Sequence, residues 1–549
     1  NQNENDKPFI NHENVVAQIE KQTETKIRDV NEKDNADNQG QKKDAKDKGS
    51  NEYFGDGGKK KKHFSNTAGT VKSRLTLMIF YLKMEGFLNM QNISLNKLKK
   101  VHFIGIGGIS MSALAEILIE KNIQVSGSDA KASELTNRLS DSGAKILYGQ
   151  KSENITPDID LVVYTAAIHK DNPEFMAAQQ AGIPMMVRAD FLGLIMKEYS
   201  NAINVAGTHG KTTTTSMISH ILLAGNCDPT ILVGGMLPSI GGNLRIGHSE
   251  NFVNESCEYT NSFLSFFPTT AVILNIAEDH LDFFKDINDI RHSFKRFMQL
   301  VPKDGYVILN SDIDDTDYFT RDLDCHIITF GKDPAKSDYS AADITYNERG
   351  CCHYTLWKNN VPLGEISLSV PGIHNVYNSL AAIAVGLNMN LSLDVIRQGL
   401  LSYTGTDRRF QYKGSVNGIT IIDDYAHHPD EITATLKAAR NYPHRETWVI
   451  FQPHTYSRTK LLYDQFVEAL SHADHVILAD IYAARETDTL GVSSELLAQS
   501  IRERGTDAYY LPDFKSIEDF VLKKCMHDDL LITMGAGNVV TIGEELLEK

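Results

Sequence analysis

Short apolar runs alternate with helical stretches from Lys99 to the end of the chain. The first block of this kind starts with the run VHFIGIGG at residues 101–108 and continues to about Ser200. Apolar runs bounded by turn signals are typical of buried strands, and strands that alternate with helices form parallel sheets with crossover helices. The pattern therefore predicts an α/β domain over residues 98–200.

Two further blocks repeat the same alternation. The second block opens with AINVAG at 202–207, and the third begins near Thr406. We therefore predict two more α/β domains, over residues 201–404 and 405–549. The other apolar runs that predict their strands are NFVNES (251–256), TAVILNI (270–276), YVILNS (306–311), ITIIDDY (419–425), TWVIFQP (447–453), HVILADIY (475–482) and LLITMGAG (530–537).

Residues 1–97 have a different composition, in which Asn, Lys, Asp, Glu and Gln dominate. Such a segment cannot bury enough apolar surface to offset the entropy lost on ordering. We predict a disordered polar tail, in which the lysine run at 59–62 is a solvated segment rather than a binding patch. Met84 and Met90 stand just before the patterned region, so an overlong translation start is a second hypothesis.

Length and charge limit the classes of protein that the chain can belong to. A chain of 549 residues is too long for one core and favours three or four domains. The net charge of −16 has the wrong sign for a general binder of nucleic acid or of anionic membranes. We expect a protein without nucleic-acid or membrane partners, either a monomer or a homodimer.

Cysteine usage and hydropathy indicate a compartment. The six cysteines show neither the paired spacing of a zinc site nor the density of a disulfide scaffold. The longest early apolar run, Leu75–Leu82, is far too short to span a bilayer and lacks a cleavage pattern close behind it. These features predict a protein of the reducing cytoplasm that is not exported.

The stretch NVAGTHGKTTTT at 204–215 carries the strongest chemical signal. A strand enters a loop in which Gly207 and Gly210 allow close approach of the backbone, and Lys211 then opens a helix. Free N–H groups at a helix N-terminus bind phosphate. We predict a nucleotide-phosphate site with Lys211 against the β- and γ-phosphates and the Thr212 hydroxyl on Mg²⁺, rather than a structural turn.

A magnesium ion on phosphates needs further oxygen ligands. The strand end NESCEY at 254–259 offers two carboxylates, Glu255 and Glu258, at the edge where parallel strands feed a binding crevice. Of the two, we favour Glu258 as the ligand.

The next strand ends in NIAEDHLDFF at 275–284, which places Asp279, His280 and Asp282 at the same edge. A solitary histidine is more often structural than a metal ligand. The convergence of three strand ends reverses that expectation, and the sequence predicts a second metal ion beside His280.

A second glycine loop, GIGGISMS at 105–112, also lies between a strand and a helix. Asp129 ends the next strand, where an acid that binds ribose would lie, but Ser110 occupies the third glycine position of the dinucleotide fingerprint. The loop therefore predicts binding of a nucleotide diphosphate, including a UDP-sugar, more securely than binding of NAD. The glycines that would let a diphosphate lie on the helix N-terminus are Gly105, Gly107 and Gly108.

Seven motifs, in the expected order over residues 98–549, resemble the Mur ligase family. The resemblance implies a Rossmann-like N-terminal domain that holds a UDP-sugar, a central domain like a P-loop ATPase, and a Rossmann-like C-terminal domain that closes over both. The motifs are GIGGISMS, AGTHGKTTT, NIAEDHLD, PGIHNVYNSLAA (371–382), DRRFQ (407–411), DDYAHHPDEI (423–432) and FQPHTYSRT (451–459).

Within the family, the chain is most similar to members that add an amino acid to a sugar carboxylate. TAAIHKDNPE (165–174), DDYAHHP and FQPHTYSR carry this finer resemblance. It implies the ATP-dependent joining of L-alanine to the lactyl carboxylate of UDP-N-acetylmuramate through an acyl phosphate, a step of peptidoglycan precursor synthesis. The implied cofactors are ATP and two Mg²⁺ ions, for which Mn²⁺ would substitute.

The resemblance also assigns roles to residues. The implied catalytic residues are Lys211, Glu258, His280, His427 and Arg458. The implied metal ligands are Thr212, Glu258 and His280. The implied ATP site comprises Gly207, Thr208, His209, Gly210, Lys211, Thr212, Thr213, Asn375, Arg409 and Asp424. The UDP-sugar side comprises Gly105, Gly107, Gly108, Asp129 and Arg188, and the amino-acid side comprises Tyr425, His427, His454 and Arg458.

Three other functions compete with this interpretation. A ligase of the same family that reattaches recycled muropeptides would take a peptide in place of L-alanine. A nucleotide-switched binding protein would release no phosphate that depends on both amine and sugar. An NAD dehydrogenase is disfavoured by Ser110 and by the stronger phosphate loop at 204–215.

Overall fold

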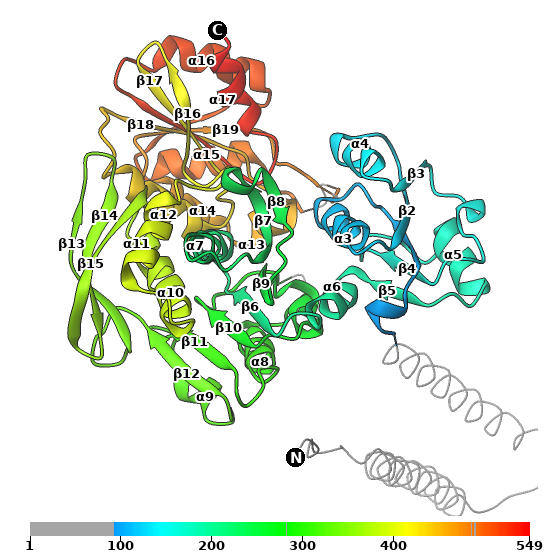
Figure 1. The fold of residues 1–549 in the computed structure, drawn as a ribbon. Helices are drawn as coiled ribbons and strands as arrows, with labels where there is room; N and C mark the ends of the chain where they lie inside the picture. Colours follow the sequence, from blue (N-terminus) through cyan, green and yellow to red (C-terminus); the bar gives the residue numbers. More distant parts are fainter. Residues whose placement is uncertain (1–92, 282, 485, 488–489) are drawn as a thin grey trace, which may run out of the picture. The chain divides into compact units, whose positions relative to one another are not determined.

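The structure, a computed structural model, describes residues 93–281, 283–484, 486–487 and 490–549. Its strands form three sheets, of five, ten and six strands (Figure 1). Most of the predicted tail, with the lysine run and both candidate start methionines, lies outside the described residues. Leu95 falls inside the range predicted as tail, yet it is 1% exposed and belongs to a hydrophobic core.

The first domain has a parallel sheet of order β3-β2-β1-β4-β5. Its strands are β1 (Lys100–Ile104), β2 (Gln124–Asp129), β3 (Lys145–Tyr148), β4 (Leu161–Tyr164) and β5 (Met185–Val187). Its helices are η1 (Leu95–Lys97), α3 (Ile109–Glu120), α4 (Glu134–Asp141), η2 (Ser152–Asn154), α5 (Pro173–Gln180) and α6 (Arg188–Met196). The strand order reverses between β1 and β4, so the glycine loop after β1 lies where open α/β sheets bind ligands.

The second domain has a ten-stranded sheet of order β15-β14-β13-β12-β11-β10-β6-β9-β7-β8. Its strands are β6 (Asn201–Ala206), β7 (Thr230–Leu237), β8 (Gly242–Arg245), β9 (Asn251–Glu255), β10 (Thr270–Ile273), β11 (Tyr306–Asn310), β12 (His326–Phe330), β13 (Tyr339–Tyr346), β14 (Cys351–Lys358) and β15 (Val361–Pro371). Its helices are α7 (Lys211–Ala224), η3 (Pro238–Ile240), η4 (Tyr259–Ser265), α8 (Ile287–Met298), α9 (Thr316–Thr320), α10 (His374–Asn388) and α11 (Leu393–Ser402).

Strand β6 lies in the middle of this sheet, between β9 and β10, and all three run parallel. The helix that follows it, α7, packs against α10 and α11 (Figure 1). Gly399 makes that packing close, because a Cβ there would lie 2.5 Å from the Cα of Ile221. The strand order reverses at β6, so its carboxyl end also lies at a position where such sheets bind ligands.

The third domain has a sheet of order β16-β17-β21-β18-β19-β20, parallel except for the edge strand β16. Its strands are β16 (Gln411–Val416), β17 (Ile419–Asp424), β18 (Thr447–Phe451), β19 (His475–Leu478), β20 (Asp507–Tyr510) and β21 (Leu530–Met534). Its helices are α12 (Pro429–Ala439), α13 (Tyr456–Leu461), α14 (Tyr463–Leu470), α15 (Ser494–Glu503), α16 (Phe514–Lys524) and α17 (Val540–Leu547). Neighbouring strands β17, β21 and β18 bring the ends of two motifs, DDYAHHP and FQPHTYSR, to one edge.

The predicted fold class of three α/β domains is confirmed, whereas the domain boundaries remain predictions. The sequence pattern missed the antiparallel edge formed by β13, β14 and β15, because one face of these strands is exposed and their apolar positions alternate with polar ones. No helix among the described residues is long and apolar enough to cross a membrane.

Candidate active site

The loop between β6 and α7 has the backbone that the sequence predicts for a phosphate cradle. Gly210 has a left-handed φ of 83°, and a Cβ there would lie 2.7 Å from Oδ1 of Asn378. Gly207 has a φ of 150°, and a Cβ there would lie 2.9 Å from the Cβ of Leu274. Gly210, the N-cap residue of α7, has no side chain with which to cap the first turn. The helix N-terminus is therefore available to an anion.

The neighbouring strand holds this loop in place. The backbone N–H of His209 donates to Oδ1 of Asn275 at 2.8 Å, and Nδ2 of Asn275 donates to the His209 carbonyl at 2.9 Å. The Thr208 hydroxyl accepts from the N–H of Ala277 at 2.9 Å. Sequence reasoning missed Asn275, although it opens the NIAEDHLD motif. The clamp forms because β6 and β10 are paired in the sheet.

Lys211 lies at the first turn of α7 with its ammonium turned back onto the loop. Nζ donates to the carbonyls of Gly207 at 2.5 Å and Thr208 at 3.1 Å, and it pairs with Glu258 at 3.0 Å. Burial alone would favour the neutral amine, but Glu258 and Glu255 hold the pKa of Lys211 above its ordinary value. The lysine is therefore a fixed positive charge at the phosphate cradle.

Thr212 bonds to Glu255 rather than to the carboxylate that we favoured from the sequence. Its hydroxyl donates to Oε2 of Glu255 at 2.9 Å, and the N–H of Gly234 donates to the same oxygen at 2.8 Å. Glu258, 2% exposed, faces Lys211 instead. Both candidate carboxylates therefore lie beside the start of α7.

His280 lies close to this group in a left-handed conformation, with a φ of 54°. Its ring stacks on Tyr259, the residue after Glu258, with 4.5 Å between centroids, and its Nε2 lies 3.7 Å from Asp279. Burial disfavours the charged carboxylate, but His280 and Arg458 hold the pKa of Asp279 below its ordinary value. Asp282 lies outside the described residues.

A cavity of about 480 Å³ opens beside the phosphate loop. Its volume is in the range of small-molecule sites. The residues from the predicted ATP site that line it are His209, Gly210, Thr212, Thr213, Asn375, Arg409 and Asp424. Lining residues that sequence reasoning missed include Lys332, His374, Asn378, Tyr403 and Glu431. His374 and Asn378 belong to the quoted motif PGIHNVYNSLAA, so their position in that motif was the available signal.

Asp424 and Arg409 contribute opposite charges to this cavity. Burial raises the pKa of Asp424 to about 6, although the carboxylate accepts from the N–H groups of Phe410 and Ala426. Burial alone would lower the pKa of Arg409, but Glu431 and Asp424 raise it. Asn375 is fixed nearby, since its Nδ2 donates to the Pro371 carbonyl at 2.7 Å.

His209 extends from the phosphate loop to the start of α12. Its Nδ1 lies 3.3 Å from Oε1 of Glu431 and its Nε2 lies 3.7 Å from Oδ2 of Asp430. Despite burial, these two carboxylates raise the pKa of His209 to about 9. Glu431 also accepts from the backbone N–H of His427 at 3.0 Å. One helix start thus contacts both the loop and the predicted amino-acid side.

The predicted amino-acid residues gather at the ends of β17 and β18. The His427 and His454 rings lie 6.0 Å apart, and the Arg458 guanidinium donates to Nδ1 of His454 at 3.2 Å. Burial lowers the pKa of His427 and brings that of His454 to about 4. Arg458 also lies 3.4 Å from Asp279, which follows β10. The motifs DDYAHHP and FQPHTYSR therefore meet the DHLD motif.

Tyr425 lies beside this cluster, and two guanidinium groups lie close to its ring. The guanidinium groups of Arg408 and Arg409 lie 4.9 and 5.3 Å from its ring centroid. Its ring also makes an edge contact with His427, with 5.4 Å between centroids.

Thr455 is the strained residue of this cluster. It has a φ of 66° and a ψ of 145° at the start of α13, a conformation that is an outlier for a β-branched residue. Its N–H donates to the Tyr482 carbonyl at 2.9 Å.

The glycine loop of the first domain holds its own acid. Asp129 accepts from the N–H of Gly107 at 2.8 Å, and a Cβ on Gly107 would lie 2.8 Å from the same oxygen. Gly105 has a φ of 83°, and Gly108 precedes α3 without a side-chain cap. The predicted diphosphate loop and the predicted ribose acid are therefore adjacent.

Arg188 lines a second cavity of about 220 Å³, and Ser110 of the glycine motif lines it too. Burial lowers the pKa of its guanidinium, and no hydrogen bond or ion pair to it is found among the described residues. Asn254 and Glu255 line the same cavity. A half-buried cation without a hydrogen-bond partner among the described residues fits an anionic ligand.

The two cavities meet at one hydrogen bond, because Thr212 lines the larger cavity and Glu255 the smaller. A lysine, a hydroxyl and carboxylates at the junction can bind a nucleotide phosphate and a cation beside a second anionic ligand. Such an arrangement is suited to phosphoryl transfer between two substrates.

Comparison with known proteins gives the class. The models of the Mur ligase family catalytic domain, middle domain and glutamate ligase domain match residues 100–200, 205–386 and 408–537. This chain belongs to the Mur ligase family, as its motifs predicted.

Individual relatives narrow the comparison. UDP-N-acetylmuramate–L-alanine ligase of Lachnospira eligens is 60% identical over 459 residues, which are 84% of this chain and 100% of that protein. The protein of the same name from Agathobacter rectalis is 57% identical over 460 residues, again 84% of this chain and all of that one.

Among solved structures, UDP-N-acetylmuramate-alanine ligase from Thermotoga maritima is similar with a TM-score of 0.69 and 29% identity, covering 82% of this chain and 98% of that chain. A murein peptide ligase from Psychrobacter arcticus has a TM-score of 0.60 and 24% identity over 82% of this chain and 98% of that one, and it shows a shared fold.

Proposed function

We propose that this chain is an ATP-dependent ligase that joins L-alanine to the lactyl carboxylate of UDP-N-acetylmuramate in peptidoglycan precursor synthesis. Relatives with that name are 57–60% identical and match along their whole length. The observation that carries the proposal in structural terms is the contact of Thr212 with Glu255, which joins a cavity on the phosphate loop to a second cavity.

In the proposed reaction the sugar carboxylate attacks ATP, so the cavities that hold these two substrates must adjoin each other. A carboxylate is a poor electrophile, so the lactyl carboxylate first attacks the γ-phosphate of ATP and becomes an acyl phosphate, with ADP as the leaving group. The amine of L-alanine, as the free base, then attacks the acyl carbon, phosphate leaves, and the nitrogen loses one proton as the amide forms. The first step brings two anions together, and the second develops negative charge on the tetrahedral intermediate and on the leaving phosphate, so the positive charge of Lys211 favours both.

We assign the magnesium sites to the residues beside α7. The Thr212 hydroxyl and the carboxylates of Glu255 and Glu258 are oxygen donors, which Mg²⁺ prefers. His280 is the proposed ligand of a second ion, and Mn²⁺ is expected to substitute. When bound there, magnesium would neutralise the negative charge of the phosphates.

The other assignments follow the same geometry. Asn375, Arg409 and Asp424 would hold the nucleoside part of ATP in the larger cavity. The loop Gly105–Gly108 with Asp129 would hold the diphosphate and ribose of the UDP-sugar, and Arg188 would bind an anionic group of the same substrate in the smaller cavity.

The amino-acid side lies where Tyr425, His427, His454 and Arg458 gather. Arg458 would bind the carboxylate of L-alanine, a contact that planar guanidinium groups favour. His454, with a pKa of about 4, stays neutral at pH 7, and because its Nδ1 accepts from Arg458 its Nε2 carries the proton and can donate a hydrogen bond to the substrate.

A cytoplasmic location agrees with the substrates and with the cysteines. None of the six forms a disulfide in the structure. Whether the enzyme is a monomer or a homodimer is a prediction for light scattering.

The proposal is tested by following ADP and phosphate with ATP, Mg²⁺ and UDP-N-acetylmuramate while single amino acids and a tripeptide are varied. We expect release that requires both the sugar and L-alanine. Preference for the tripeptide would instead indicate a muropeptide-recycling ligase. ADP formation at the same rate without the sugar would overturn the ligase assignment.

A further inference from the structure

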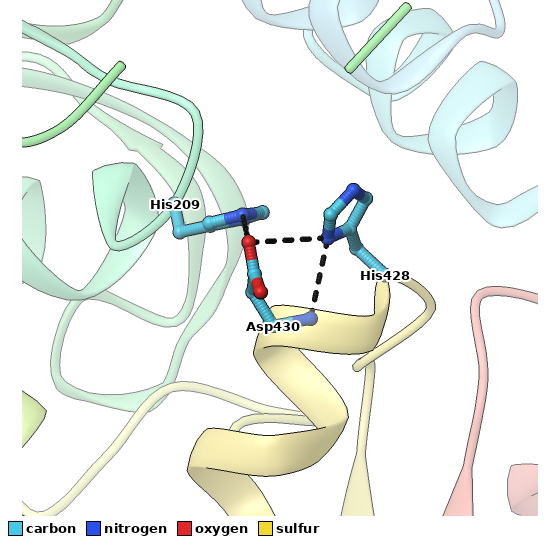
Figure 2. Close-up of side chains that lie close together, drawn as sticks. All are labelled: His209, His428 and Asp430. Atoms are coloured by element: carbon cyan, nitrogen blue, oxygen red, sulfur yellow. Dashed lines mark hydrogen bonds and ion pairs between the residues drawn. The ribbon is translucent and has the colours of Figure 1, made fainter. Parts of the chain in front are cut away.

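Two histidines and an aspartate converge where the phosphate loop meets the start of α12 (Figure 2). One ligand atom from each of His209, His428 and Asp430 lies within 4.8 Å of the other two. His209 belongs to the loop after β6, whereas His428 and Asp430 belong to the N-terminus of α12. None of the three is among the magnesium ligands assigned above.

The outer nitrogens of both rings are already anchored to oxygen. Nδ1 of His209 lies 3.3 Å from the Glu431 carboxylate, and Nε2 of His428 lies 3.2 Å from the carbonyl of Glu278. When each of these nitrogens donates its N–H, the remaining nitrogens, Nε2 of His209 and Nδ1 of His428, present lone pairs. Histidines that bind metals are held by such acceptors on the opposite ring nitrogen.

The inner nitrogens face one carboxylate oxygen. Oδ2 of Asp430 lies 3.7 Å from Nε2 of His209 and 3.8 Å from Nδ1 of His428. These separations are too long for hydrogen bonds. Nε2 of His209 is buried and has no hydrogen-bond partner in the described part of the chain. Figure 2 shows both rings directed toward the Asp430 side chain.

We propose that His209, His428 and Asp430 form a Zn²⁺ site that links the phosphate loop to α12. Two imidazole nitrogens and one carboxylate, with a fourth position left for water, are a ligand set of zinc, whereas Mg²⁺ prefers oxygen ligands alone. In a tetrahedral zinc site, ligand atoms lie roughly 3.3–3.4 Å apart. The contacts of Asp430 with the two rings need to shorten by only a few tenths of an ångström.

The surroundings supply charge and freedom of movement. Asp430 and Glu431 place two carboxylates around two imidazoles, and this excess of negative charge suits a dication. The Asp430 side chain is 64% exposed and can move toward the rings. Nδ1 of His428 accepts a long hydrogen bond of 3.3 Å from the N–H of Asp430, and this bond is lost when the nitrogen binds the metal.

The test uses the full-length chain, stripped with a chelator and kept in excess Mg²⁺ so that oxygen sites are filled. Zn²⁺ is titrated against a chromophoric chelator, and thermal melts are recorded with and without Zn²⁺. We expect one equivalent of Zn²⁺ whose affinity falls at least about tenfold in His209→Gln and in Asp430→Asn. Zn²⁺ should raise the melting temperature of the unaltered protein but not that of either variant.

His353→Gln is the matched control, because His353 is an exposed histidine 3.0 Å from a carboxylate of Glu365 and lies on β14. It should bind Zn²⁺ as the unaltered chain does. Asp430→Asn changes an exposed side chain, so it keeps the test valid if His209→Gln fails to fold. Equal Zn²⁺ affinity in the unaltered chain and in Asp430→Asn, or no tight equivalent in the presence of Mg²⁺, would overturn the site.

Discussion

The hydroxyl of Thr212 donates a 2.9 Å hydrogen bond to Glu255, and these two residues line different cavities. Thr212 is in the first turn of α7, the helix that follows the phosphate loop. Glu255 is the last residue of β9, which is separated in the sheet by β6 from β10, the strand that precedes His280. The pair therefore lies where the γ-phosphate and the sugar carboxylate have to meet in the proposed reaction.

Replacing Thr212 separates the role of its hydroxyl from that of its shape. Thr212→Val keeps the volume but removes the oxygen that bonds Glu255, and we expect kcat to fall about 10²-fold or more. Thr212→Ser keeps the hydroxyl and should stay within a few-fold of the unaltered enzyme. Steady-state ADP release at saturating substrates measures both, and equal activity of the valine and serine variants would contradict the assignment.

The carboxylate partner gives a second prediction. In Glu255→Gln, the remaining amide oxygen can still accept from Thr212 and from the Gly234 N–H, but the negative charge that would bind a cation is lost. We expect turnover to fall about 10- to 100-fold while the fold is retained. Glu250→Gln, an exposed change at the start of the same strand, is the control and should be silent. The comparison is made by phosphate release and by circular dichroism.

Lys211 is expected to be indispensable, because its ammonium is the buried cation of the phosphate cradle. Lys211→Ala should lower the turnover rate at least about 10²–10³-fold. Its loss leaves Glu258 buried without its cation, so some stability is also lost, and nucleotide binding must be measured on folded protein. Normal turnover by this variant would exclude the loop as the site of ATP.

The strands and the phosphate loop were predictable because their signals are local. An apolar run followed by glycines and a lysine specifies a strand, a left-handed turn and a helix start within a dozen residues, as at Gly207–Lys211. The turn at Gly105–Gly108 and the helix start after it were predictable for the same reason, whereas binding of a UDP-sugar there remains a prediction.

The pairing of side chains within the site was not predictable in the same way. Sequence favoured Glu258 over Glu255, but which of the two meets Thr212 depends on the register of β9 beside β6, in which Val205 pairs with Glu255. The contact of His209 with Glu431 joins residues 222 positions apart, and no local pattern encodes it. Such contacts follow from packing between sheets rather than from periodicity.

Arg458 gives a prediction about specificity. Its guanidinium spans His454 and Asp279, at 3.2 and 3.4 Å, which fixes its direction. Arg458→Lys keeps the charge but loses the planar fork, so we expect a KM for L-alanine raised about tenfold or more, with the KM for ATP nearly unchanged. A parallel rise in both constants would show a general loss of structure. The measurement is a pair of substrate titrations.

A fall in pH should destabilise the fold through a buried histidine that lies outside the active site. His220 on α7 is 6% exposed, and its two ring nitrogens bond the hydroxyls of Ser402 at 2.7 Å and Ser239 at 2.8 Å. Burial lowers its pKa from 6.5 to about 4. The folded chain therefore binds this proton less readily than the unfolded chain, so the stabilising contribution is complete above pH 6.5 and is lost as the pH falls toward 4.

Replacing this histidine should remove that sensitivity. Across the whole interval the contribution is on the order of 3 kcal/mol. The free energy of unfolding of the unaltered chain should therefore exceed that of His220→Gln most at neutral pH, and the difference should shrink steadily between pH 6.5 and 4.5. Denaturant unfolding at several pH values measures the difference. A gap between the unaltered chain and His220→Gln that is independent of pH would mean that the imidazole is not held neutral by burial, and that its two hydroxyl contacts stabilise the charged ring as well as the neutral one.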